Sequence, residues 1–118
     1  MKSRKCLLAA MLCLPALALA QAWPVKPVRL IVANSAGSAT DVAGRVFADQ
    51  LSKQTARAIA VENRPGGDGF IGAQAVISSA PDGYTLFFAS QSTVAIDPHL
   101  HKTMPFDPVR DFTALSVV

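Results

Sequence analysis

The sequence predicts an α/β fold, in which a parallel sheet is flanked by helices. Three short apolar or β-branched segments, at 28–33, 58–62 and 84–89, are typical of strands. Helical patterns lie between them, from 41 onward and over roughly 70–79. Because strand–helix–strand crossovers of this kind favour right-handed parallel connections, we expect all three strands in one sheet. In the spatial order 2-1-3, the carboxyl ends of the first and third strands are neighbours.

The first strand, Val28 to Ala33, is nearly all apolar, which is typical of a strand covered on both faces. The preceding Trp23-Pro24-Val25-Lys26-Pro27 is expected to be extended, because each proline biases the residue before it away from helix. In the first helix, Thr40 or Asp41 is the expected N-cap. Its apolar residues recur at helical spacing: Val42, Val46, Phe47 and Leu51.

The rest of the chain alternates between turns and regular elements. The breaker cluster 63–69 separates the second strand from the second helix, and Pro81-Asp82-Gly83 forms the turn before the third strand. We expect a short helical turn near 94–97, then an irregular crossover, and a further strand that begins at 114–118.

Residues 1–20 have the features of a cleavable signal peptide. A basic start is followed by an apolar run over 6–18 and by the small-x-small pattern Ala18-Leu19-Ala20. A membrane anchor is the alternative, but a run of about 13 residues is shorter than the roughly 20 that span a bilayer. We therefore expect secretion, with residues 21–118 forming one small domain. Since the chain ends in an apolar run, we expect it to be the N-terminal part of a longer protein.

Charge and cysteine content exclude several functions. The chain has 11 basic and 8 acidic residues, a net charge of +3. Without Lys2, Arg4 and Lys5 of the leader, bases and acids balance, so the basic excess is no argument for nucleic-acid binding. Cys6 and Cys13 also lie in the leader, which leaves no disulfide, cysteine metal site or cysteine nucleophile in the predicted domain.

Two loops are candidates for ligand binding. The loop 34–40 leads into a helix N-terminus, whose free N–H groups can face an anion, and the loop Ser90 to Thr93 should lie beside it. Hydroxyl groups in both loops can donate hydrogen bonds to a carboxylate. The alternative is a tight connection whose small residues only permit close packing. With Gly37 as its single glycine, the first loop is neither a dinucleotide fingerprint nor a P-loop.

The cluster Asn63 to Gly69 resembles a phosphate-type loop because it also precedes a helix. We favour instead a glycine-rich turn, with Arg64 paired to a neighbouring carboxylate such as Glu62 or Asp68.

No catalytic or metal-binding set stands out. His99 and His101 lie beside two aspartates in an irregular segment, but they lack the spacing of a metal site, and we expect them at the surface. No G-x-S-x-G nucleophile elbow is present. A helix cap is favoured for Asp41 over acid–base catalysis. We therefore expect no metal, no cofactor and no enzymatic activity.

Five motifs, in order, resemble the N-terminal part of the Bug family, the TctC-like extracytoplasmic solute receptors of tripartite tricarboxylate transport systems. They are Trp-Pro-Val-Lys-Pro-Val-Arg (23–29), Val-Glu-Asn-Arg-Pro-Gly-Gly-Asp-Gly (61–69), Pro-Asp-Gly-Tyr-Thr-Leu (81–86), Asp-Pro-His-Leu (97–100) and Pro-Phe-Asp-Pro-Val-Arg-Asp-Phe (105–112).

The resemblance implies a periplasmic binding protein of two α/β domains that close on a small carboxylate like a Venus flytrap. Residues 21–118 are then the N-terminal α/β ligand-binding domain, which is incomplete, and the second domain is missing. It implies a monomer that works with the membrane subunits of the transporter and does not bind nucleic acid. The ligand-binding residues that carry over are Ser35, Ala36, Gly37, Ser38, Ala39, Thr40, Asp41, Ser90, Gln91, Ser92 and Thr93. In the first loop, Ser38 and Ala39 stand where the family pattern has glycines. The alternatives are an exported α/β enzyme that uses Asp41 or a histidine, and a non-functional receptor fragment.

Overall fold

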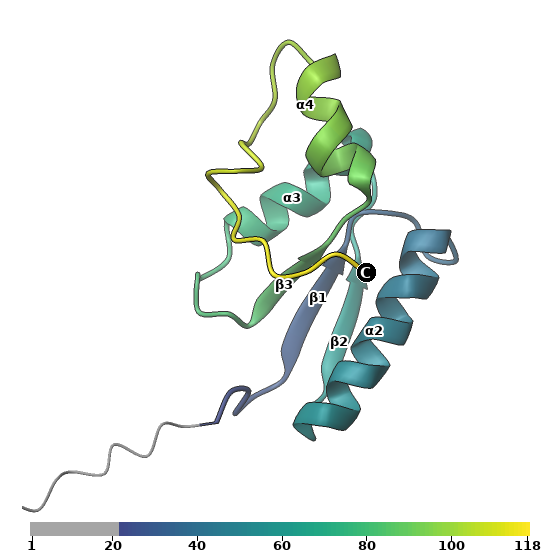
Figure 1. The fold of residues 1–118 in the computed structure, drawn as a ribbon, viewed down its shortest axis with the longest axis vertical. Helices are drawn as coiled ribbons and strands as arrows, with labels where there is room; N and C mark the ends of the chain where they lie inside the picture. Colours follow the sequence, from purple (N-terminus) through teal and green to yellow (C-terminus); the bar gives the residue numbers. More distant parts are fainter. Residues whose placement is uncertain (1–21) are drawn as a thin grey trace, which may run out of the picture.

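A three-stranded parallel sheet forms the centre of the fold, in the order β2-β1-β3 (Figure 1). The computed structural model describes residues 22–118, so the predicted signal peptide lies outside the described residues. The strands are β1 (Val28–Val32), β2 (Ile59–Asn63) and β3 (Thr85–Phe88). The parallel direction predicted from the crossovers is confirmed, and the strands lie in the 2-1-3 order in which the ends of the first and third strands are neighbours.

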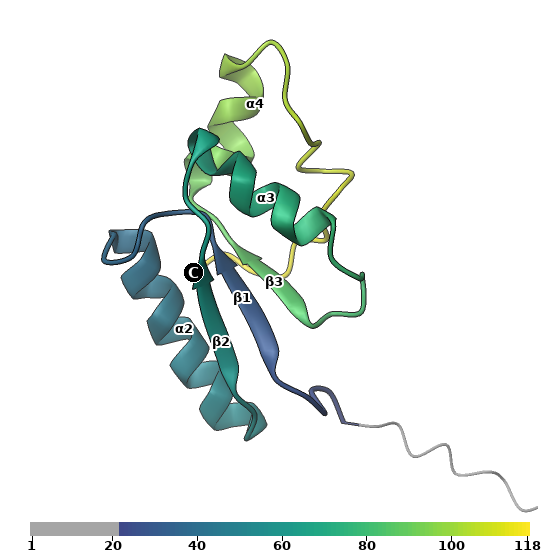
Figure 2. The same ribbon diagram turned by 180° about the vertical axis from the view of Figure 1, so that it is seen from behind.

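Two long helices cover opposite faces of this sheet (Figures 1 and 2). On one face, Phe47 of α2 (Ala39–Thr55) contacts Phe88, with 5.9 Å between ring centroids. Successive side chains of a strand point to opposite faces, and Phe87 accordingly stacks on Phe112 of the C-terminal segment. The helix α3 (Phe70–Ile77) packs on that second face.

The central strand carries the core. Val28, Leu30, Ile31 and Val32 are the largest fully buried side chains in the part of the chain that the structure describes. This confirms the prediction, from the unbroken apolar run, that the first strand is covered on both faces.

The N-terminus of α2 differs from the prediction. Its N-cap is Ser38, whose Oγ accepts a hydrogen bond from the Asp41 N–H at 3.2 Å. The prediction of Thr40 or Asp41 as the cap was wrong, because Asp41 occupies the third helical position. There its carboxylate reaches back to the Gly37 N–H at 2.8 Å, in a reciprocal arrangement like a capping box.

The C-terminus of α2 offers a test of backbone strain. Ala56 follows the helix in the left-handed conformation, with φ 53° and ψ 31°. Because its Cβ is unfavourable there, Ala56→Gly should raise the free energy of unfolding by about 0.5–1 kcal/mol. Urea unfolding measures this change. The control Ala43→Gly, at an exposed position inside α2, should lower stability by a similar amount. An Ala56→Gly variant that is less stable than the parent would contradict the assignment.

Short helical elements gather at the carboxyl edge of the sheet. They are η2 (Gly67–Gly69) before α3, and the π-helical η3 (Ser92–Ile96), which runs directly into α4 (Asp97–Leu100). The helical turn predicted near 94–97 is therefore part of a longer helical run, and His99 lies in α4 and not in an irregular segment. Within residues 22–118, no helix combines the length and the apolar character that a membrane crossing requires.

The C-terminal segment returns from α4 along the face that α3 covers (Figure 1). Phe106 is buried there, in edge-on contact with Phe70 and Phe112. The prediction of a strand at 114–118 was wrong. These residues are exposed and pair with no strand in the described range, and an apolar run becomes a strand only where a neighbour completes its hydrogen bonds.

Candidate ligand-binding site

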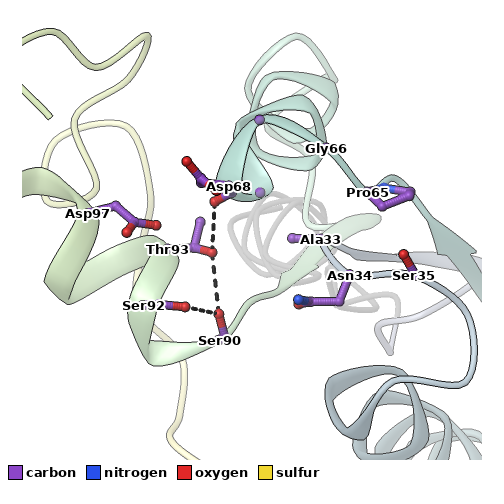
Figure 3. Close-up of a pocket in the computed structure, with 12 residues that line it drawn as sticks. Ala33, Asn34, Ser35, Pro65, Gly66, Asp68, Ser90, Ser92, Thr93 and Asp97 are labelled. Carbon is purple, nitrogen blue, oxygen red and sulfur yellow. Dashed lines mark hydrogen bonds between the residues drawn. The ribbon is translucent and has the colours of Figure 1, made fainter. Parts of the chain in front are cut away.

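A cleft of about 440 Å³ lies where all three strands end (Figure 3). Loops that follow β1, β2 and β3 each contribute to its wall, as does the start of α4. The lining residues are Ala33, Asn34, Ser35, Pro65, Gly66, Gly67, Asp68, Gly69, Ser90, Ser92, Thr93 and Asp97. This position agrees with the rule that parallel α/β sheets bind ligands outside the carboxyl ends of their strands.

A row of hydroxyl groups forms the wall that follows β3. Ser90 Oγ lies 2.6 Å from Ser92 Oγ and 3.4 Å from Thr93 Oγ1, and Thr93 Oγ1 donates to the Asp68 carbonyl oxygen at 3.2 Å. Thr93 is buried. Its bond to Asp68 joins the segment after β3 to the loop after β2. The row thus holds two walls of the cleft together (Figure 3).

The loop after β2 lines the cleft, although the sequence favoured a plain turn. Its backbone turns sharply, with positive φ at Gly66, Gly67, Asp68 and Gly69. Gly69 is buried, and a Cβ there would lie 2.6 Å from Thr93 Oγ1. The position of this cluster between a strand and a helix was the one sequence signal for its place in the cleft.

Arg64 takes no part in the cleft wall. Its Nε donates to Glu62 Oε1 at 2.6 Å, which confirms the predicted pairing with Glu62. Arg29 and Arg64 both donate to this carboxyl group and lower its pKa, with the Arg29 hydrogen bond as the larger cause.

Most of the predicted first loop lies away from the cleft. Ser35 lines it, whereas the wall includes none of the other residues predicted in this loop, Ala36, Gly37, Ser38, Ala39, Thr40 and Asp41. Asp41 is buried, and its carboxylate accepts hydrogen bonds from the Gly37 N–H, from Arg45 Nε at 3.0 Å and from Asn63 Nδ2 at 2.8 Å. The Arg45 hydrogen bond, followed by those from Gly37 and Asn63, lowers the pKa of Asp41 to about 2. Asp41 is therefore a fixed anion that shapes the loop.

Of the second predicted loop, Ser90, Ser92 and Thr93 line the cleft, whereas Gln91 is exposed and does not. The structure adds Asp97, which is 8% exposed. It also adds Asn34, whose Oδ1 is buried and accepts no hydrogen bond within residues 22–118. Sequence reasoning missed Asp97, whereas Asn34 belongs to the candidate loop 34–40 but was not among the predicted ligand-binding residues.

The histidines lie outside the cleft wall. His99 is exposed. His101 Nε2 lies 3.4 Å from Asp68 Oδ2, and its ring meets Phe70 edge-on. Over residues 22–118, His, Cys, Asp and Glu side chains form no group of three or more that could hold a metal ion.

Comparison with known proteins identifies the family of this chain. Residues 43–118 match the family model described as the tripartite tricarboxylate transporter family receptor, TctC. The chain belongs to the TctC family. Similar relatives include a UPF0065 protein of Bordetella bronchiseptica, 43% identical over 99 residues, and Protein BugT of Bordetella pertussis, 36% identical over 100 residues. Each match covers 84% of this chain but only 30% and 31% of the relative.

Solved structures of similar proteins share the fold. MatC from Rhodopseudomonas palustris, with bound malate, has a TM-score of 0.73 at 31% identity. A second R. palustris protein, with adipate, has a TM-score of 0.70 at 32% identity. The matches cover 77% and 74% of this chain and 31% and 29% of those proteins. The chain thus spans about a third of the length of a periplasmic binding protein and has the α/β fold of the matching part.

Proposed function

We propose that the chain is the ligand-binding part of an extracytoplasmic solute receptor that captures a small carboxylate for a tripartite tricarboxylate transport system. Residues 1–20 direct export to the periplasm, and residues 21–118 form the N-terminal lobe. A second α/β lobe closes on the ligand, and the receptor acts as a monomer. Its partners are the membrane subunits of the transporter, and it performs no catalysis.

The observation that carries this proposal is the set of free backbone donors at the cleft. The N–H groups of Ser35, Gly67 and Asp68 donate no hydrogen bond to any group within residues 22–118, and all three residues line the cleft. Backbone N–H groups in a turn attract anions, and a carboxylate can accept several such bonds at once. The malate and adipate named for the solved relatives are carboxylates of the same kind.

Capture without catalysis fits the state of the candidate acid–base groups. Three hydrogen bonds occupy the Asp41 carboxylate, and neither His99 nor His101 lines the cleft. A general base must reach the proton that it abstracts. The alternative of an exported enzyme that uses Asp41 or a histidine therefore gains no support from the geometry.

Titration of the purified chain with adipate or malate, followed by ¹H–¹⁵N NMR, tests the proposal. We expect saturable shifts of the Ser35, Gly67 and Asp68 amide signals, and no such shifts with the uncharged dimethyl ester of the same acid. Ser35→Trp, which fills the cleft, should weaken binding about tenfold or more. The matched control Ala36→Trp changes the neighbouring residue, which lies outside the cleft wall, and should stay within about twofold of the parent.

Equal shifts with acid and ester would contradict recognition of the carboxylate. A chain whose spectrum shows no dispersed amide signals, or that binds none of the acids, would instead support the alternative of a non-functional receptor fragment.

A further inference from the structure

The wall of the cleft carries acidic side chains, although the proposed ligand is an anion. Asp68 and Asp97 line the cleft, and among residues 22–118 its wall includes no lysine, arginine or histidine (Figure 3). Resting on the proposed function, we propose that protonated His101 offsets the charge of Asp68 and so tightens carboxylate binding as the pH falls from about 8 to about 6. His101 is then a positioning residue that acts through Asp68.

His101 reaches the cleft wall from outside. Its Nε2 lies 3.4 Å from Asp68 Oδ2, and its ring meets Phe70 edge-on, with 5.2 Å between ring centroids. Its backbone N–H donates to the Asp97 carbonyl oxygen at 3.0 Å, which fixes the chain at the end of α4. Contacts with two other elements, η2 and α3, thus hold the imidazole beside the Asp68 carboxylate.

Asp68 connects His101 to the ligand. Its N–H is one of the three free donors proposed to bind the carboxylate, and its carbonyl oxygen accepts from Thr93 Oγ1 at 3.2 Å. A ligand carboxylate on this N–H lies close to the side chain of the same residue, and like charges repel. A positive charge on His101 offsets this repulsion. A charge-assisted hydrogen bond from the imidazole also holds the turn that presents the free N–H groups.

Few charged groups surround the imidazole. Asp68 belongs to η2, Asp97 to α4, and Lys102 follows in the chain, whereas α3 contributes the uncharged Phe70. Histidine is the side chain whose charge ordinarily changes between pH 5 and 8, while carboxyl groups are largely ionised there. Within residues 22–118, His101 is the histidine in contact with a residue of the cleft wall. It is therefore the group through which pH can change the charge beside the ligand.

The expected effect is modest. The side chains of His101 and Asp68 are 37% and 66% exposed, and exposed ion pairs are weak because water screens them. We expect adipate to bind the purified chain about threefold more tightly at about pH 6 than at about pH 8, and the difference to shrink in about 0.5 M NaCl. By linkage, saturation with adipate should raise the midpoint of the His101 titration, followed by ¹H NMR, by about half a pH unit.

Two histidines of one helical segment give a matched pair of variants. His101→Gln keeps a hydrogen-bond donor but removes the charge, so it should bind adipate at both pH values as weakly as the parent does at about pH 8. His99→Gln is the control, because His99 is exposed and pairs with no carboxylate among the described residues. It should keep the full pH dependence, and it also accounts for any change in ionisation of adipate itself.

Asp68→Asn tests the same pair from the other side. Asparagine tolerates the left-handed backbone of this position, where φ is 54°. Without the negative charge, adipate should bind at about pH 8 at least as tightly as the parent binds it at about pH 6, and the pH dependence should disappear. Dispersed amide signals in the ¹H–¹⁵N spectrum of each variant check that it is folded.

The outcomes separate this proposal from the proposed function. If the parent binds adipate equally at both pH values, or if His101→Gln keeps the pH dependence, His101 does not have this role, and carboxylate capture stands. A His101 midpoint that saturation with adipate leaves unchanged would overturn the role in the same way. Absence of adipate binding at either pH would contradict the proposed function and the pH dependence together.

Discussion

Replacement of Gly69 by alanine is expected to lower the free energy of unfolding by about 3 kcal/mol. Gly69 has φ +90°, which an L side chain rarely adopts. A Cβ there would also lie 2.6 Å from Thr93 Oγ1, 2.8 Å from Thr93 Cγ2 and 3.3 Å from Ala33 Cβ. The variant therefore combines backbone strain with overpacking between two loops of the cleft. Urea unfolding measures the effect as a shift of the midpoint concentration, provided that the dependence of the unfolding free energy on urea concentration stays the same.

Gly37→Ala separates the two causes. Gly37 also has a positive φ, +82°, but a Cβ there would meet nothing within 4 Å. Its cost should be the backbone part alone, about 1 kcal/mol. The double variant Gly69→Ala/Thr93→Ala should be less destabilised than the two single variants added together, since Thr93 supplies the closest contacts. Equal effects of Gly69→Ala and Gly37→Ala would show that the contact with Thr93 does not constrain this position.

Replacement of Asp41 by alanine is the second large effect that we expect, a fall in Tm on the order of 10 °C. Asp41 is buried and joins three parts of the fold: the Gly37 N–H in the loop after β1, Arg45 in α2 and Asn63 at the end of β2. Alanine would leave these donors without their acceptor, and a buried donor without a partner is costly. Thermal unfolding followed by circular dichroism measures the loss.

The same carboxylate predicts a pH dependence. The pKa of Asp41 is lowered to about 2 in the folded chain, chiefly by the Arg45 hydrogen bond, from 3.8 as the reference value. The folded state binds this proton less tightly than the unfolded state does. The contribution of the ionised Asp41 carboxylate to stability is therefore complete above about pH 4 and is lost as the pH falls toward 2. We expect acid unfolding of the parent to be steeper over this window than that of Asp41→Asn.

Asp49→Asn is the matched control for both measurements. Asp49 lies on the same helix and pairs with Lys53 at 2.6 Å, but both side chains are exposed. Surface ion pairs of this kind contribute little to stability. If Asp49→Asn lowers Tm as much as Asp41→Ala does, or if the acid unfolding of Asp41→Asn matches that of the parent, the network around Asp41 does not have the structural role that we assign to it.

Much of the fold could be predicted from local patterns. The apolar run of β1 indicated a strand covered on both faces, and Val28, Leu30, Ile31 and Val32 are indeed fully buried. The pattern failed at 114–118, where residues of equally apolar character stay exposed. A strand depends on a neighbour for its hydrogen bonds, and a pattern within one segment cannot supply that information.

The candidate site was less accessible to sequence reasoning. The sequence pointed to the loops after β1 and β3, but treated the loop after β2 as a turn, although all three line the cleft. It also counted Asp41 among the ligand-binding residues, whereas the carboxylate is taken up by Gly37, Arg45 and Asn63. Asn63 lies 22 positions from Asp41 in the chain, and only the pairing of β2 with β1 brings them together.

Periodicity, crossover length and motifs that are continuous in the chain were enough to predict the class of fold, the parallel direction of the strands and the family. Which polar groups remain without a partner within residues 22–118 depends on how the segments pack together: the N–H groups of Gly67 and Asp68, and the buried Oδ1 of Asn34. Local patterns cannot predict these groups, because a hydrogen bond between segments that are distant in the chain satisfies one polar group and leaves its neighbour free. The groups left free at the cleft determine which ligand it can hold.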